Sequence, residues 1–285
     1  MEFEKSYSLE EIEDRLHQGA LPFSGSTELG SAGFVFQRPA FYAGMAIHVG
    51  SRIRDNLQDA IAVSQADRYR EEDPGTDQFI KDMPLQIIAR DSRFEYDVNR
   101  PEELAIPIKP EMSWGLTVWN RPLTAEEKET SMAKYREFHR LIDILGDYLV
   151  QNHDRAYIFD LHSYCYQREK RLPWHEDAKP AINLGTNSIN MNLFREDIDD
   201  FLGRLGRITV GERPLTVAEN EVFKGGYLAR RLSARYHDQM AVFAIEFKKI
   251  FMDEWSGEFY PDIFNALVGQ FSATVQEYIN KRKIK

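Results

Sequence analysis

A long amphipathic segment followed at once by a short apolar run constrains the fold of this chain more than any other feature. Within residues 124–153 the apolar positions recur at helical intervals, namely Met132, Tyr135, Phe138, Leu141, Ile142, Leu145 and Leu149. The run RAYIFDLHS that follows is typical of a buried strand whose carboxyl end opens into a loop. Together they predict a sheet covered by helices.

Helical and strand patterns alternate along the rest of the chain. Residues 7–18 predict a first helix, with Ser8 and Glu11 spaced as a capping box. Strands are predicted at FVFQRP, AGMAIHVG and QMAVFAIEFKKIFM. Further helices are predicted at residues 55–69, FREDIDDFLGRL, GGYLARRLSARYH and PDIFNALVGQFSATVQEYINKR. This alternation predicts a three-layer α/β architecture.

Two segments have less regular patterns. Residues 83–101 predict an extended, strand-rich segment, and residues 164–192 a long loop able to cover a pocket, because they are polar and contain several Pro, Gly and Asn residues. No repeat, low-complexity tract or linker divides the chain, so we expect one domain over residues 1–285.

Composition excludes several classes of function. The formal net charge is −10, whereas nucleic-acid-binding surfaces need clustered Lys and Arg. The start, MEFEKSYSLEEIEDRL, lacks the order of a secretory signal, and no apolar run approaches membrane-spanning length. The single cysteine, Cys165, has no partner for an internal disulfide. We therefore expect a cytoplasmic protein without nucleic-acid or membrane partners.

Two histidines lie where predicted strands give way to polar residues: His48 in MAIHVGSR and His162 in IFDLHSY. Zinc in hydrolytic sites usually takes three N or O ligands and leaves a position for water, so this pair needs one carboxylate, which REEDPGTD can supply. Asp160 is placed to accept the other N–H of a metal-bound His162. Alternatively, both histidines are hydrogen-bonded structural residues, and strand alternation alone puts Asp160 beside His162.

The segment SRFEYDVNR, residues 92–100, is a second candidate site. Arg93 and Arg100 flank Asp97 and Asn99 there. The planar fork of arginine suits two-point recognition of a carboxylate, and Asn can add an amide donor. An ion-paired strand edge is the alternative explanation.

Glu246 stands inside the otherwise apolar run VFAIEFKKIF. A carboxylate in such a strand is costly unless it is paired, hydrated or facing a cavity. Burial would raise its pKa toward values useful for taking a proton from water. The alternative is an amphipathic strand with one wet face.

In this order, IHVGSRI, REEDPGTD, SRFEYDVNR, DLHSY and AIEFKK resemble the motifs of the N-formylglutamate amidohydrolase family, and ENEVFKGG is similar to its asparagine and Lys-Gly-Gly stretch. The resemblance spans residues 40–260. It implies a fold like that of zinc carboxypeptidases and aspartoacylase-like deacylases, with a mixed, twisted sheet of about eight strands between helices. Where many members read Pro-His-Ser-Gly, this chain has Ile47-His48-Val49-Gly50.

The resemblance also implies a metal site. His48 and His162 match the family's metal-binding histidines, and Zn²⁺ is the expected cofactor. Carboxypeptidases place a glutamate three residues after the first histidine, where this chain has Ser51. The third ligand is therefore expected farther along, at Glu72 or Asp77, with Glu72 preferred.

Other matched residues imply the reaction. Arg93 matches the family's transition-state arginine, Glu246 its catalytic glutamate, and Asn99 with Arg100 its clamp for a substrate carboxylate. We expect a zinc-dependent amidohydrolase that cleaves the amide bond of a small N-acyl amino acid, as in the conversion of N-formyl-L-glutamate to formate and glutamate.

Three alternatives stay open at this level. The same residues would serve a zinc carboxypeptidase or a deacylase acting on another acyl amino acid or peptide. A metal-free carboxylate-binding module would need the arginines but neither an open metal position nor Glu246. A cysteine hydrolase would need a base within reach of Cys165.

Overall fold

A nine-stranded mixed sheet forms the centre of the computed structural model, which describes residues 3–168 and 171–282. Its strands run in the order β1-β2-β3-β5-β4-β6-β11-β7-β10. They are β1 Ser6–Tyr7, β2 Phe23–Thr27, β3 Ala32–Phe36, β4 Tyr42–Ala46, β5 Leu85–Ala89, β6 Ala156–Tyr164, β7 Ile182–Gly185, β10 Val217–Glu219 and β11 Met240–Lys248. Two short strands, β8 Thr209–Val210 and β9 Arg213–Pro214, pair separately.

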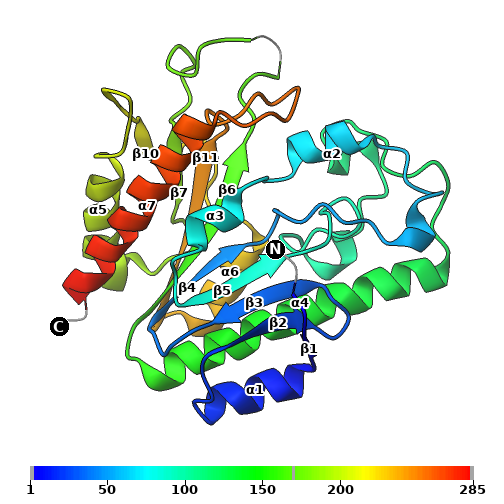
Figure 1. Cartoon of the computed structure of the whole chain (residues 1–285), viewed down its shortest axis with the longest axis horizontal. Coiled ribbons are helices and arrows are strands. Elements are labelled where there is room, and N and C mark those ends of the chain that lie inside the picture. Colours follow the sequence, from blue (N-terminus) through cyan, green and yellow to red (C-terminus); the bar gives the residue numbers. More distant parts are fainter. Residues whose placement is uncertain (1–2, 169–170, 283–285) are drawn as a thin grey trace.

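Helices cover both faces of the main sheet (Figure 1). One layer holds α1 Leu9–His17, α4 Ala125–Asn152 and α6 Tyr227–Tyr236, and the other holds α3 Thr76–Ile80, α5 Met191–Leu205 and α7 Pro261–Arg282. The connections contain α2 Gln65–Glu71 and the short 3₁₀ helices η1 Asp55–Leu57, η2 Glu102–Leu104 and η3 Pro110–Met112. The predicted three-layer α/β architecture is confirmed, with one strand more in the main sheet than expected. Within the described ranges, none of the helices combines the length and the apolar character needed to cross a bilayer.

Local sequence explains where the first and the longest helix begin. In α1 the Ser8 hydroxyl accepts from the Glu11 N–H at 3.2 Å and the Glu11 carboxylate accepts from the Ser8 N–H at 2.9 Å, as predicted. Thr124 and Glu127 form the same reciprocal box at α4. Each box satisfies two backbone donors that the first helical turn leaves without partners.

Side-chain alternation along β11 separates the core from the opposite face of the sheet. Phe243 packs with its ring 5.1 Å from Phe201 of α5, and Phe247 lies 5.5 Å from Phe271 of α7. Because successive strand residues point to opposite faces, Glu246 is directed away from this aromatic layer.

Three predicted segments differ from the structure. Residues 55–69 are not one helix, because Ser64 caps a new helix, α2, by accepting from the N–H of Asp67 at 3.0 Å. The segment 164–192 is not a continuous loop: β6 extends to its start, β7 lies within it, and α5 begins before its end. Residues 83–101 contain β5, but the chain then forms turns instead of a second strand.

Buried carboxylates explain why the chain leaves the sheet after β5. Asp91 is 5% exposed and accepts from Lys134 Nζ of α4 at 2.7 Å and from Arg52 Nε at 2.7 Å. Glu95, fully buried, pairs with Arg54. A buried carboxylate needs such partners, and partners on different elements prevent regular strand pairing here.

The Lys134→Met variant is expected to lower the free energy of unfolding by about 3 kcal/mol, because it leaves the buried Asp91 with one cation fewer. Urea denaturation measures the change. Lys128→Met, at an exposed position of the same helix, is the control and is expected to change stability by less than about 0.5 kcal/mol. Equal effects of the two variants would contradict this role of Lys134.

Candidate active site

Three neighbouring strands of the sheet, β4, β6 and β11, bring the predicted site residues together. His48 follows β4 by two residues, and His162 lies near the carboxyl end of β6. Glu246 is the register partner of His162 on the adjacent parallel strand β11. Carboxyl ends of parallel strands meet at one edge of a sheet, which is where α/β proteins place their sites.

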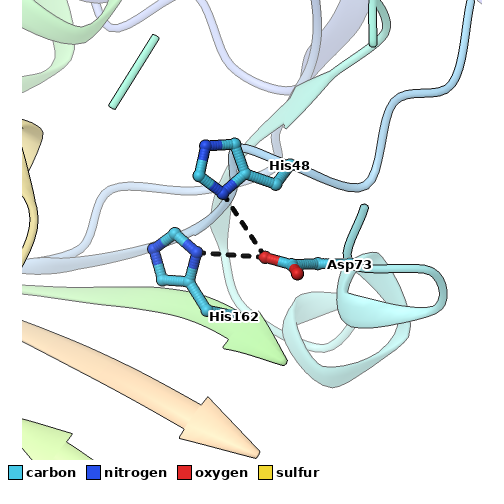
Figure 2. A group of neighbouring side chains, drawn as sticks. All are labelled: His48, Asp73 and His162. Carbon is cyan, nitrogen blue, oxygen red and sulfur yellow. Dashed lines mark hydrogen bonds and ion pairs between the residues drawn. The ribbon is translucent and has the colours of Figure 1, made fainter. Parts of the chain in front are cut away.

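The two imidazoles converge on a single carboxylate oxygen (Figure 2). Asp73 Oδ2 lies 3.4 Å from His48 Nδ1 and 3.1 Å from His162 Nδ1. The three residues are almost fully buried, and their ligand atoms all lie within 4.8 Å of one another. His48 Nδ1 makes no hydrogen bond within the described part of the chain. Two imidazole nitrogens and one carboxylate oxygen match the donor set of a hydrolytic zinc site, and the buried Nδ1 of His48 has a lone pair without a partner among the described residues.

Asp73 replaces Glu72 and Asp77 as the acidic member of this cluster. The Glu72 carboxylate accepts from the Ser92 hydroxyl and is not among the groups that converge. Asp77 lies in α3, where its carboxylate accepts from Gln78 Nε2 at 2.9 Å. Asp73 follows the last residue of α2 by two positions, and its N–H donates to the His48 carbonyl at 2.9 Å, which fixes the two segments side by side. REEDPGTD contains all three acids, and the sequence alone does not show which one turns toward the histidines.

The outer nitrogens of both imidazoles face carboxylates. His48 Nε2 lies 2.9 Å from Asp97 Oδ1, and His162 Nε2 lies 3.1 Å from Asp160 Oδ2, the partner predicted for it. A carboxylate at Nε2 favours the tautomer with the proton there, which leaves the Nδ1 lone pair facing Asp73. The role of Asp97 as the partner of His48 was not predicted, although its place between two arginines marked the segment.

Asp97 also connects the imidazole of His48 to both arginines. Its other oxygen accepts from Arg93 at 2.7 Å and lies 3.2 Å from Arg100 Nε. Burial opposes its ionisation, but Arg93, His48 and Arg100 together hold the pKa of Asp97 well below its usual range. The carboxylate is therefore charged, and it holds Arg93 in a fixed orientation.

A cavity of about 360 Å³ opens beside the cluster. His48, Asp73 and His162 line it together with Arg93, Asn99 and Glu246. Burial raises the pKa of Glu246 to about 7, a value that suits a proton acceptor near neutral pH. A larger hollow of about 840 Å³ lies at the other end of β6, around Arg155, Asp197 and Arg282, and contains none of the predicted site residues.

The structure does not bring Arg100 to this cavity. Its guanidinium donates to the Met112 carbonyl and pairs with Asp97, so it lies behind the cavity wall. Asn99 does line the cavity, and its side-chain oxygen accepts from the Leu228 N–H at 2.9 Å. Only one half of the predicted carboxylate clamp therefore faces the site.

Cys165 lacks the properties of a nucleophile. Its thiol donates to the Arg70 carbonyl at 3.1 Å. Burial raises its pKa to about 11, so the thiolate that a cysteine hydrolase needs is scarce near neutral pH.

Comparison with solved structures shows the same fold in distant proteins. N-formylglutamate amidohydrolase from Ralstonia eutropha JMP134 has a TM-score of 0.67 and 18% identity over 88% of this chain and 98% of that one. A gene product from Agrobacterium tumefaciens has a TM-score of 0.56 and 19% identity over 83% and 92%. A metallo-carboxypeptidase from Burkholderia cenocepacia, with a TM-score of 0.40 and 11% identity over 97% and 70%, is too distant to add to these.

No curated protein sequence matches the chain. The sequence profile of N-formylglutamate amidohydrolases, however, matches residues 45–252, well over half of the 285 residues. The matched range contains the His48–Asp73–His162 cluster, Arg93 and Glu246. A hydrolase acting on amide bonds is supported by this match. The chain belongs to the N-formylglutamate amidohydrolase family.

Proposed function

We propose that this protein is a zinc-dependent amidohydrolase that cleaves a small N-acyl amino acid, with N-formyl-L-glutamate as the first substrate to test. The observation that carries the proposal is the convergence of two imidazole nitrogens and the Asp73 carboxylate on one point beside Glu246, in a cavity of about 360 Å³. Pockets of this size suit small molecules.

His48, Asp73 and His162 would hold the metal through Nδ1, Oδ2 and Nδ1. When bound, zinc supplies Lewis acidity, which polarises an amide carbonyl and lowers the pKa of water. Asp97 and Asp160 would keep both imidazoles in the ligating tautomer.

Glu246 acts in this proposal as general base and then as general acid. Its carboxylate takes a proton from water as the water oxygen bonds to the amide carbon, and it returns that proton to the leaving amine nitrogen as the C–N bond breaks. Its raised pKa, about 7, suits both transfers near neutral pH.

Arg93 is proposed to stabilise the oxyanion that forms on the amide carbonyl. It lines the cavity, and its guanidinium is oriented by Asp97 at 2.7 Å and by the Trp114 ring at 4.8 Å. A donor held in place before the reaction stabilises charge that develops only in the transition state. Asn99 is proposed to contact the substrate carboxylate, with Arg100 acting through Asp97.

Metal analysis combined with an activity assay tests the proposal. We expect about one zinc per chain by elemental analysis and release of formate from N-formyl-L-glutamate, lost on chelation and restored by added zinc. Bound zinc without formate release would retain the proposal of amide hydrolysis but reject N-formyl-L-glutamate as the substrate. Absence of both zinc and activity would reject the proposed function.

A further inference from the structure

Residues 222–226, between β10 and α6, form one wall of the cavity and are firmly held. Asn183 of β7 is fully buried and is the register partner of Glu246. Its side-chain oxygen accepts from the N–H groups of Glu221 and Val222, at 3.0 and 2.9 Å, and its amide donates to the Phe223 carbonyl at 2.8 Å. Asn183, which lies beside Glu246 in the sheet, thus holds this wall in place.

The backbone is also fixed at and after Lys224. The Lys224 carbonyl accepts from the Asn187 N–H at 3.1 Å. Asn99 accepts from the Leu228 N–H at 2.9 Å, and a Cβ on Gly226 would lie 2.2 Å from the Asn99 amide, so the wall leaves no room for a side chain there. Lys224 therefore projects from a rigid backbone at the cavity.

Most cations that line the cavity already have partners. Arg93 pairs with Asp97, and both nitrogens of the Arg168 fork donate to Glu71, at 2.9 and 2.6 Å. Lys249 is 1% exposed and donates to backbone carbonyls, at 2.7 Å in the case of Glu72. Arg168 and Lys249 are therefore not free to take up an additional anion without losing these contacts, and Arg93 is already assigned to the oxyanion.

Lys179 and Lys224 are the remaining lining cations, both exposed. Lys179 belongs to a charged group with Lys248 and Asp177: burial and then the charge of Lys179 lower the pKa of Lys248, which lies 3.1 Å from Asp177. Neither Lys179 nor Lys224 has an ion-pair partner within residues 3–168 and 171–282, but Lys179 stands near the Lys248–Asp177 pair. Val222 and Phe223 line the cavity beside it and offer apolar contact for methylene groups.

We propose that Lys224 determines specificity by pairing with an anionic group at the end of the substrate's side chain. This inference rests on the hydrolysis proposed above, and it assigns a residue to the choice of an acylated acidic amino acid over its neutral analogues. A short methylene chain ending in a carboxylate matches the apolar flank and the cation of this wall. In a protein of net charge −10, the exposed Lys179 and Lys224 at the cavity also attract anionic substrates locally.

The test compares N-formyl-L-glutamate with the nearly isosteric, neutral N-formyl-L-glutamine. For Lys224→Met we expect kcat/KM to fall about ten-fold or more for the glutamate derivative and to change little for the glutamine derivative, because one charge-assisted contact is lost. Lys128→Met, which removes one exposed positive charge on α4, is the matched control and should leave the preference intact. Lys179→Met is expected to have the smaller effect of the two cavity lysines.

A binding measurement makes the result independent of turnover. Calorimetric titration of the purified protein with L-glutamate and L-glutamine should show a preference for glutamate that Lys224→Met removes. If both formyl substrates are cleaved but Lys224→Met keeps the wild-type preference, the assignment is overturned while the hydrolysis stands. Loss of the preference in Lys179→Met alone overturns it as well. If neither substrate is cleaved, N-formyl-L-glutamate is rejected as the substrate, and the titration alone decides for or against Lys224.

Discussion

Glu246→Gln is expected to lower kcat for N-formyl-L-glutamate by about 10³-fold or more, with zinc content unchanged. The amide of Gln keeps the shape of the side chain but cannot accept and return the proton that hydrolysis moves from water to the leaving amine. Glu246 is not one of the three groups whose atoms converge as metal ligands, so metal binding should persist. Steady-state kinetics and elemental analysis of the same preparation measure both quantities.

The matched control for this variant is Glu221→Gln. Glu221 is an exposed carboxylate next to the cavity wall that does not line the cavity, so its replacement removes the same charge without touching the reaction. We expect near wild-type kcat for it. Normal turnover in Glu246→Gln would remove Glu246 from the mechanism, and loss of zinc in that variant would reassign it to the metal site.

Asp73→Asn is expected to weaken zinc binding by more than the ~10–100-fold that loss of an outer partner of a metal ligand typically costs. The substitution removes the charge of the carboxylate on which both imidazoles converge and leaves two neutral nitrogens to hold a divalent cation. Competition with a chromogenic chelator measures the affinity. Hydrolysis should fall in parallel and recover in part at high zinc concentration.

Glu72→Gln and Asp77→Asn are the controls that show whether zinc binding depends on the position of Asp73 or on any acid of this stretch. Each removes one negative charge from the same acidic stretch, but neither carboxylate faces the histidines. Both variants should retain zinc. Retention of zinc by Asp73→Asn together with its loss in Glu72→Gln would show that the cluster in the structure is not the metal site.

Much of the architecture is encoded in short stretches of sequence. The starts of α1 and α4 follow from reciprocal caps three residues apart, and β6 and β11 follow from apolar runs that are long enough to cross a sheet. Interactions of this kind involve neighbours in the chain, so they are visible before any tertiary contact is known. The same holds for His48, His162 and Glu246 as candidate residues, because their polar types contrast with the apolar strands that carry or precede them.

Residues 90–101 show where local pattern stops being informative. Their alternation favoured a strand, but the buried carboxylates of Asp91 and Glu95 pair with Lys134 of α4 and with Arg54, and that of Asp97 lies against the imidazole of His48. These partners fix the path of the chain. A buried charge must be compensated wherever its partner lies, and this requirement overrides strand propensity. It also turns Arg100 toward Asp97 and away from the cavity.

The sequence by itself predicted the α/β class and singled out the two histidines and the acidic residue of β11 as candidates, because these depend on periodicity and on residue type at strand ends. Only the tertiary structure decided that Asp73, and not Glu72 or Asp77, meets the histidines, and that Asn183 and Asn99 hold Lys224 at the cavity. The physical reason is that adjacent residues in an irregular segment point in different directions, and their direction is set by contacts with groups far away in the chain.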